Sequence, residues 1–418
     1  MERRENRILL CLCHLSGNEQ KFVQEAFDTN WVVPLGPNVN GFEKDLEEFC
    51  GQNKRVVALS AGTAAVHLGL LACGVGPGDE VCVQSFTFCA SSHPITYLGA
   101  TPVFIDSEKD TWNMDPELLE KAIIDRKEKT GKYPKAIVPV ALYGMPYKID
   151  RIMKIANKYE IPVVEDAAEG FGSKFNGQVL GTFGKYGVLS FNGNKMITTS
   201  GGGALITENE DEWREIMMYA TQYRESYPYY QHEKIGYNYR MSNICAGIGR
   251  GQMTIVNEHI AHHKKVQKMY EELLKDVKGV TVHSQPATGE YDSNYWLCTM
   301  TMDPDVKVKG QENAYKQVIT GAVGGAAGVI HAASSAVTDC QPNDNVEAMR
   351  MGLDALNVES RPLWKPMHKQ PVYKNAPAYV NGVSEALFKV GMCLPAGPYV
   401  KEDDVRFIVE AIKSLIVS

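Results

Sequence analysis

The chain has 418 residues, of which 44% are hydrophobic and 22% are charged, and its formal net charge is −7 at pH 7. This length exceeds what a single hydrophobic core usually supports, so we expect one large domain with a smaller one attached. The acidic balance argues against nucleic acid as a partner, because binding a phosphate backbone needs clustered Lys and Arg. No apolar run approaches the roughly 18 residues of a membrane span, so we expect no membrane partner either.

Ten cysteines are scattered from Cys11 to Cys393 without a C-x-x-C pair, which is typical of reduced thiols in a cytoplasmic protein. The first residues have a faint resemblance to a signal peptide, with basic residues before a short apolar run over 8–15. His14 interrupts that run and no small-residue cleavage site follows it, so we expect a cytoplasmic location.

Two helices are predicted before the first strand. Residues 19–31 have an apolar face that includes Phe22 and Phe27, which favours an amphipathic helix. Two prolines and a glycine in residues 32–37 end that helix. The second helix is predicted to begin near Gly41.

From residue 55 onward the sequence alternates between short apolar runs and helical patterns. Strands are predicted at residues 56–59, 80–84, 101–106, 136–140, 161–165, 187–191 and 203–207. Several of these runs are apolar on both faces, which indicates an α/β fold with a mostly parallel central sheet sandwiched by helices. In such sheets ligands bind outside the carboxyl ends of the strands.

Lys195 and Asp166 follow two of these strands and form the central candidate site. Pyridoxal phosphate needs an amine that condenses with its aldehyde and a carboxylate that keeps its ring nitrogen protonated. Each residue also has an ordinary interpretation, because most lysines are solvated and an aspartate after a strand is commonly a turn residue. The site hypothesis therefore depends on what lies at the neighbouring strand ends.

Two further segments fall at such ends. Residues 60–65 place a glycine and hydroxyls at a strand-to-helix turn, which is typical of an anion site and equally of an ordinary capped turn. Residues 85–88 place Phe86 and Phe88 after a strand, where an aromatic ring can cover a flat heterocycle or simply belong to the core. Residues 236–242 crowd polar groups beside a glycine, as a site loop or a surface loop would.

A long helical stretch over residues 242–275 carries His259 and His263 at i, i+4 spacing, which zinc sites use. No third ligand is evident, and lysines follow at once. We therefore predict a solvated helix face and no metal site.

The C-terminal part is predicted to be the smaller domain. We place the division between residues 1–255 and 256–418, with a strand at 296–300 and a Gly- and Ala-rich insertion over about 310–345. No function can be argued for the insertion.

Together these segments resemble the DegT/DnrJ/StrS family of sugar-nucleotide aminotransferases, and the resemblance covers nearly the whole chain. It also rests on residues 30–37, 76–81, 165–169, 236–242 and 360–364. The resemblance implies the aspartate aminotransferase-like fold of fold type I enzymes, with a smaller α+β C-terminal domain. Two departures are Ala61, where many relatives have a second serine, and the length of the insertion.

By this resemblance, Lys195 forms the Schiff base with pyridoxal 5′-phosphate and Asp166 pairs with its ring nitrogen. Phe88 is expected to stack on the ring, and Glu169 to lie near its 3-hydroxyl side. Glu169 stands where other members carry Gln or His, and it is associated with transfer to C4 of the sugar.

The resemblance also implies which residues bind the phosphate and the substrate. The phosphate is expected to contact Gly62, Thr63, Ala64 and Ser190, and Asn238 of the neighbouring subunit. The active unit would then be a homodimer with shared active sites. Arg361 and His368 resemble positions that edge the substrate cleft.

The implied function is transfer of an amino group from glutamate to C4 of a 4-keto-6-deoxy nucleotide sugar for polysaccharide or glycan assembly. A C3 transaminase or a dehydratase on a related keto sugar is the alternative among enzymes. Because Lys195 is present where dehydrating relatives have histidine, it argues against dehydration. A regulatory protein that binds the cofactor without turnover is the alternative outside enzymes.

Overall fold

The central sheet dominates the structure, a computed structural model that describes residues 1–316 and 339–417. Its strand order combines two four-stranded groups, β1-β9-β8-β5 and β4-β2-β3-β15, joined by parallel bridges between Ile137 and Val163 and between Val140 and Asp166. The strands are β1 (Arg55–Leu59), β2 (Glu80–Gln84), β3 (Thr101–Ile105), β4 (Ala136–Val138), β5 (Val164–Asp166), β8 (Tyr186–Ser190), β9 (Gly203–Thr207) and β15 (Ala378–Tyr379). All seven strands predicted for the sheet are present.

The prediction of a mostly parallel sheet is confirmed. β2 pairs in parallel with β3 and β4, β3 with β15, and β5 with β8, whereas β9 runs antiparallel to both β1 and β8. The apolar runs indicated burial on both faces but carried no information on strand direction. The reversed β9 therefore could not be predicted from them.

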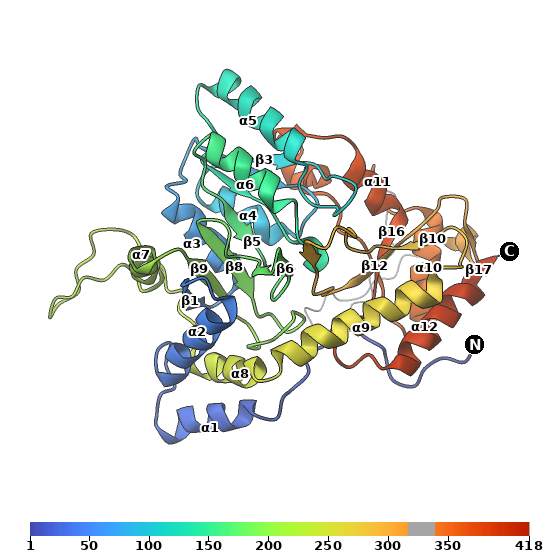
Figure 1. Cartoon of the computed structure of the whole chain (residues 1–418), viewed down its shortest axis with the longest axis horizontal. Helices are drawn as coiled ribbons and strands as arrows, with labels where there is room; N and C mark the ends of the chain where they lie inside the picture. The colour runs from blue at the N-terminus through green and yellow to red at the C-terminus, as the bar shows by residue number, and fades with distance from the viewer. Residues whose placement is uncertain (317–338, 418) are drawn as a thin grey trace.

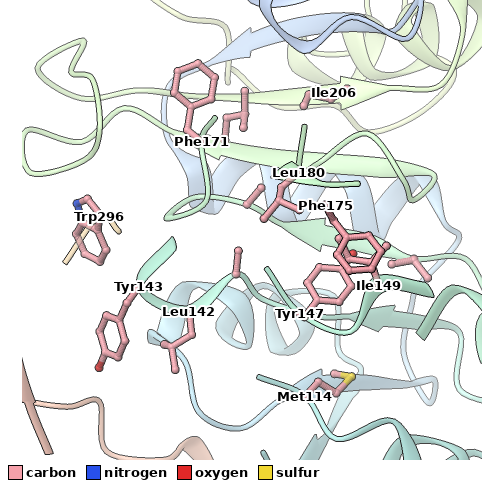
Figure 2. Packing of buried hydrophobic residues seen from close by; sticks show 14 of the residues in the cluster. Met114, Leu142, Tyr143, Tyr147, Ile149, Phe171, Phe175, Leu180, Ile206 and Trp296 are labelled. Atoms are coloured by element: carbon pink, nitrogen blue, oxygen red, sulfur yellow. The ribbon is translucent and has the colours of Figure 1, made fainter. Parts of the chain in front are cut away.

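Helices cover both faces of this sheet (Figure 1). Alternate residues along a strand enter opposite cores, as Val56 and Val57 of β1 do. The core on one side includes residues of α2 (Pro37–Cys50), α5 (Pro116–Thr130) and α6 (Ile149–Lys158), and Figure 2 shows part of it. The core on the other side includes residues of α3 (Gly62–Ala72), α4 (His93–Tyr97) and α7 (Glu210–Ala220).

The two N-terminal helices differ in detail from their predictions. α1 (Glu19–Asp28) ends earlier than expected, and Phe27 is 57% exposed rather than on a buried face. α2 begins at Pro37 rather than near Gly41, because proline is favoured in the first helical turn, where its missing N–H is not needed. α8 (Asn243–Met253) and α9 (Val256–Leu274) fill the predicted helical stretch.

A second sheet and its own core form the right-hand part of Figure 1. This antiparallel sheet has the order β10-β12-β16-β14. Its strands are β10 (Val280–Val282), β12 (Cys298–Met302), β14 (Arg361–Pro362) and β16 (Gly391–Leu394), and the neighbouring helices are α9, α10 (Asp344–Ala355), α11 (Val383–Val390) and α12 (Glu402–Leu415). Short strands complete the chain as β6 (Lys174–Phe175), β7 (Gln178–Val179), β11 (Tyr291–Asp292), β13 (Lys307–Val308) and β17 (Ile416–Val417).

Two segments cross the predicted boundary at residues 255 and 256. Ile8 pairs with Val358 and is buried in the second core, whereas β15 adds to the edge of the central sheet. The division into domains remains a prediction, and most of the insertion predicted at about 310–345 lies outside the described residues. No helix among residues 1–316 and 339–417 is long and apolar enough to cross a membrane.

Candidate active site

A cavity of about 410 Å³ opens where β5 and β8 end and α3 begins. Seven of the residues predicted from the sequence line it, namely Gly62, Thr63, Phe88, Asp166, Glu169, Ser190 and Lys195. The carboxyl ends of adjacent strands bring these residues together although they span more than a hundred positions of the chain, as the sheet topology predicts.

Lys195 is held on the loop that follows β8, where its N–H donates to the Asn192 carbonyl at 2.9 Å. The side chain is 13% exposed, and its Nζ lies 3.4 Å from Oε1 of Glu169. On another side, Nζ lies 4.0 Å from the centre of the Trp296 ring. The amine is therefore inside the cavity, with one carboxylate and one aromatic face beside it.

Asp166 is the last residue of β5 and is buried. Its Oδ2 accepts a hydrogen bond from the Ser91 hydroxyl at 2.6 Å, and its Oδ1 accepts from the Ala168 N–H at 3.1 Å. Burial raises the pKa of the Asp166 carboxyl, while these two hydrogen bonds and the charge of Lys195 act in the opposite direction. The site thus presents an oriented carboxylate that a cationic ring nitrogen would stabilise.

The first turn of α3 forms the anion-binding end of the cavity. Ala61 precedes the helix in an extended conformation, and the N–H groups of Gly62, Thr63 and Ala64 have no intrahelical acceptors. A Cβ on Gly203 of β9 would lie 2.3 Å from the Gly62 nitrogen, so glycine at 203 lets the sheet approach this turn closely. Ala64 belongs to the turn but does not line the cavity.

Glu169 links the amine to the opposite wall. Its Oε2 accepts the Tyr143 N–H at 2.7 Å, and the Tyr143 hydroxyl accepts the Trp364 N–H at 2.8 Å. Tyr143 is buried and has a φ of 54°, a left-handed conformation that is uncommon for a bulky residue. Burial raises the pKa of Glu169, and the Lys195 charge counteracts that rise.

Phe88 lines the cavity and is 50% exposed, and the centre of its ring lies 5.4 Å from that of Trp364. A second cavity of about 680 Å³ adjoins the first and shares Phe88, Trp296 and Trp364 with it. Arg361 lines this second cavity and is paired with Glu359 at 3.0 Å.

The two remaining predicted residues lie elsewhere. His368 lines neither of these cavities, and its Nδ1 lies 2.6 Å from the Ser85 hydroxyl. Asn238 is exposed and pairs with Thr221 at the base of the long loop between α7 and α8. The loop itself projects from the body of the molecule in Figure 1. It does not line the cavity of its own chain.

The prediction of a solvated histidine face was wrong. His259 and His263 are buried, with their Nδ1 atoms 3.1 Å from the carbonyls of Met196 and Tyr295. Helical periodicity could not show that α9 packs against the loops that carry these carbonyls. Burial lowers the pKa of His263 to about 3. Within the described part of the chain, no group of three side chains could hold a metal ion.

Sequence reasoning also missed Ser91, Tyr143 and Trp296. Ser91 is only three residues beyond the predicted segment 85–88, so extending that segment would have included it. Tyr143 has no local signal for its φ, and Trp296 comes from a region that we predicted as an ordinary strand.

This donor set fits pyridoxal phosphate. The buried Asp166 suits the ring nitrogen, Lys195 suits the aldehyde, and the first turn of α3 suits the phosphate. A mostly parallel sheet carrying such a site defines the class of fold type I pyridoxal phosphate enzymes.

Comparison with known proteins places the chain within this class. The model of the DegT/DnrJ/EryC1/StrS aminotransferase family matches residues 14–324 and 311–413, and the chain belongs to that family. A crystal structure of a DegT DnrJ EryC1 StrS aminotransferase from Brucella abortus is 27% identical and superposes with a TM-score of 0.80, covering 95% of each chain. The predicted family, fold and aminotransferase class are thereby confirmed.

Three curated relatives extend the comparison. EpsN of Bacillus subtilis (strain 168), provisionally named a pyridoxal phosphate-dependent aminotransferase, is 41% identical over 98% of this chain and 96% of its own. A GDP-perosamine synthase of Caulobacter vibrioides is 34% identical over 98% and 99% of the two chains. A UDP-2-acetamido-2-deoxy-3-oxo-D-glucuronate aminotransferase of Pseudomonas aeruginosa is 37% identical over 58% of this chain and 65% of its own.

Proposed function

We propose that this protein transfers the amino group of glutamate to C4 of a 4-keto-6-deoxy nucleotide sugar, using pyridoxal phosphate. The observation that carries the chemistry is the meeting of an amine, a buried carboxylate and an anion-binding helix end in one cavity of about 410 Å³. The product would be a 4-amino-4,6-dideoxy sugar nucleotide for polysaccharide or glycan assembly.

The bound cofactor supplies an aldehyde that condenses with amines and a ring that takes up the electron pair released at Cα. Asp166 would keep the ring nitrogen protonated, so that the ring can take up this electron pair. The N–H groups of Gly62 and Thr63 and the Ser190 hydroxyl hold the phosphate. Phe88 lines the cavity and would stack on the ring of the cofactor.

Lys195 has two tasks. Its Nζ would hold the cofactor through a covalent bond to the aldehyde, and when free it would act as the base and acid that moves a proton of the substrate. Oε1 of Glu169 lies 3.4 Å from Nζ. Its negative charge would compensate the positive charge of Lys195 whenever Nζ is protonated. The same residues would perform the reverse half-reaction on the keto sugar.

The choice of C4 is supported by Glu169 at its position and by the relative named GDP-perosamine synthase, since perosamine is a 4-amino-4,6-dideoxy sugar. Transfer to C3 is the second candidate, and the relative named for a 3-oxo sugar favours it. Incubation with glutamate and a panel of 3-keto and 4-keto nucleotide sugars, followed by mass spectrometry and NMR of the products, separates them. Amination of only the 3-keto members would overturn the C4 assignment.

Exchange of Lys195 for alanine tests the chemistry itself. We expect Lys195→Ala to lose the visible absorbance band of the covalent bond between Nζ and the cofactor aldehyde. We also expect it to reduce transamination by roughly 10³-fold or more. Lys195→Arg is the matched control, because it keeps a positive charge but forms no covalent bond with the aldehyde. Retention of the cofactor band in Lys195→Ala would contradict the proposal. Bleaching of the wild-type band by glutamate alone separates an enzyme from a cofactor-binding regulator.

We also propose a homodimer with shared sites. Apolar side chains are exposed on the loop between α7 and α8, with Tyr230 at 79% and Ile235 at 83% exposure, and on residues 31–35 beside α2. Exposed apolar groups of this number on one chain favour a protein partner. Asn238 lies on the same loop, which supports its assignment to the phosphate of the neighbouring subunit.

A further inference from the structure

The amine of Lys195 lies between an anion and an aromatic face. Its Nζ is 3.4 Å from Oε1 of Glu169 and 4.0 Å from the centre of the Trp296 ring. The side chain of Lys195 is 13% exposed, and Trp296 is 2% exposed. An ammonium group with so little water around it needs compensation from the protein, and these two groups supply it.

Trp296 is fixed in this position by its own polar contacts. Its Nε1–H donates to the carbonyl of Asn194, the neighbour of Lys195, at 2.6 Å. Its backbone N–H donates to Oδ1 of Asn294 at 2.8 Å. The ring is therefore tied to the segment whose lysine it faces.

Asn294, which accepts the backbone N–H of Trp296, also contacts the backbone around Glu169. Nδ2 of Asn294 donates to the carbonyls of Glu169 and Phe171, at 2.9 Å in each case. A Cβ at Gly144 would lie 1.9 Å from Oδ1 of Asn294, so the glycine leaves the space that this amide occupies. Asn294 thus fixes the aromatic face and the backbone of the carboxylate residue relative to each other.

We propose that Trp296 is a positioning residue of the transamination, and that its indole face and Glu169 form a cation box for the Lys195 ammonium whenever that amine is not bonded to the cofactor. The proposal rests on the proposed function for its role in turnover. When Nζ has accepted a proton, it carries one positive charge, which the box compensates. When Nζ returns that proton, the amine becomes neutral. It can then leave the box and bond to the cofactor again.

The test compares Trp296→Phe with Trp296→Leu. Both variants lose the Nε1–H donor and leave space, but only phenylalanine keeps an aromatic face. The readout is the rate at which trace acetic anhydride labels Lys195 at one fixed pH, measured by mass spectrometry in the cofactor-free protein and in protein loaded with pyridoxamine phosphate. Trp364→Leu opens the same cavity without removing a group that contacts Nζ, and controls for access.

We expect labelling of Lys195 to be roughly 5- to 30-fold faster in Trp296→Leu than in wild type, with Trp296→Phe between them, as cation–π energies at desolvated sites imply. Glu169→Gln should also accelerate labelling, whereas Trp364→Leu should not. Equal rates in Trp296→Phe and Trp296→Leu would overturn the proposal.

A second measurement covers the case in which the leucine variant does not fold. Site-specific fluorinated tryptophans at position 296 keep the size and the N–H donor but weaken the aromatic face. Labelling should rise with each added fluorine, and a rate independent of fluorination would overturn the box. Because the cofactor-free readout needs no turnover, a failed box is distinguishable from a failed proposed function, which the cofactor band of Lys195→Ala tests separately.

Discussion

Asp166 is a carboxylate that the folded protein buries before any cofactor arrives. Burial raises its pKa, so the folded chain binds a proton at this carboxyl more tightly than the unfolded chain does. The stability that protonation gives is present below the pKa of the unfolded chain, and it is lost as the pH rises through the folded pKa. At neutral pH the ionised, buried Asp166 therefore lowers the stability of the cofactor-free protein. A cationic ring nitrogen beside it would restore that stability.

We expect Asp166→Asn to separate these two effects. Without cofactor, the variant should melt about 1–3 °C above wild type at pH 7, and the difference should shrink as the pH falls towards about 4. With cofactor, its transamination should fall by at least roughly 10²-fold. Calorimetry across this pH range and steady-state assays measure the two results. Ser91→Ala, which removes a hydrogen bond that lowers the pKa, should destabilise the protein at pH 7.

Among single residues, the sequence predicted those that follow strands. Lys195 and Asp166 could be placed because strand ends of a parallel sheet meet at one edge. Trp296 could not, since it reaches the site from a loop about a hundred positions away. The burial of His259 was missed for the same reason, as its partner is a carbonyl on a distant loop.

At the scale of elements, one buried carboxylate contributes three hydrogen bonds to the segment by which the C-terminal part returns to the central sheet. Asp106 follows β3, is fully buried, and accepts the N–H groups of Asn381, Gly382 and Ser384 at 2.9–3.1 Å. These donors lie between β15 and the first turn of α11. Asp106 therefore binds the backbone of residues 381–384, directly after the strand β15 that extends the sheet.

We predict that Asp106→Ala lowers the free energy of unfolding by about 2–5 kcal/mol, because it removes the charged acceptor of three N–H groups, of which that of Ser384 is buried. Denaturant unfolding measures this loss, and limited proteolysis should show faster cleavage near residues 376–384. Asp110→Ala is the control, since its exposed carboxylate pairs with Lys148 at the surface and should contribute at most about 1 kcal/mol. Equal losses in both variants would contradict the role of Asp106.

The sequence predicted the long strands of this sheet but not its edge. β15 has only two residues, and no periodicity can be recognised in so short a segment. The pairing of β15 with β3 and the contacts of Asp106 beside it link positions about 275 residues apart.

At the scale of the whole molecule, shared sites can be tested by complementation between subunits. If Lys195 and Asn238 serve the same site from different subunits, then a mixed dimer of Lys195→Ala and Asn238→Asp has one intact site. Random mixing of the two inactive variants should restore about a quarter of wild-type activity. Each variant alone is the control, and no recovery in a mixture shown to contain mixed dimers would contradict shared sites.

The composition and the alternating elements were enough to predict a large α/β part and a second core. They did not show that Ile8 would join that second core, because its partner Val358 lies 350 positions further along the chain. Such pairings follow from the three-dimensional closure of the molecule rather than from any local pattern.

The pairing of β15 with β3 has a consequence for the order of events during synthesis. A nascent chain that has not reached Ala378 leaves β3 as an open edge, and open edges invite pairing with other chains. Before Trp296 and Trp364 emerge, the cavity also lacks the walls that these residues form. A chain that stalls before these residues therefore presents an unpaired strand edge and an incomplete cavity.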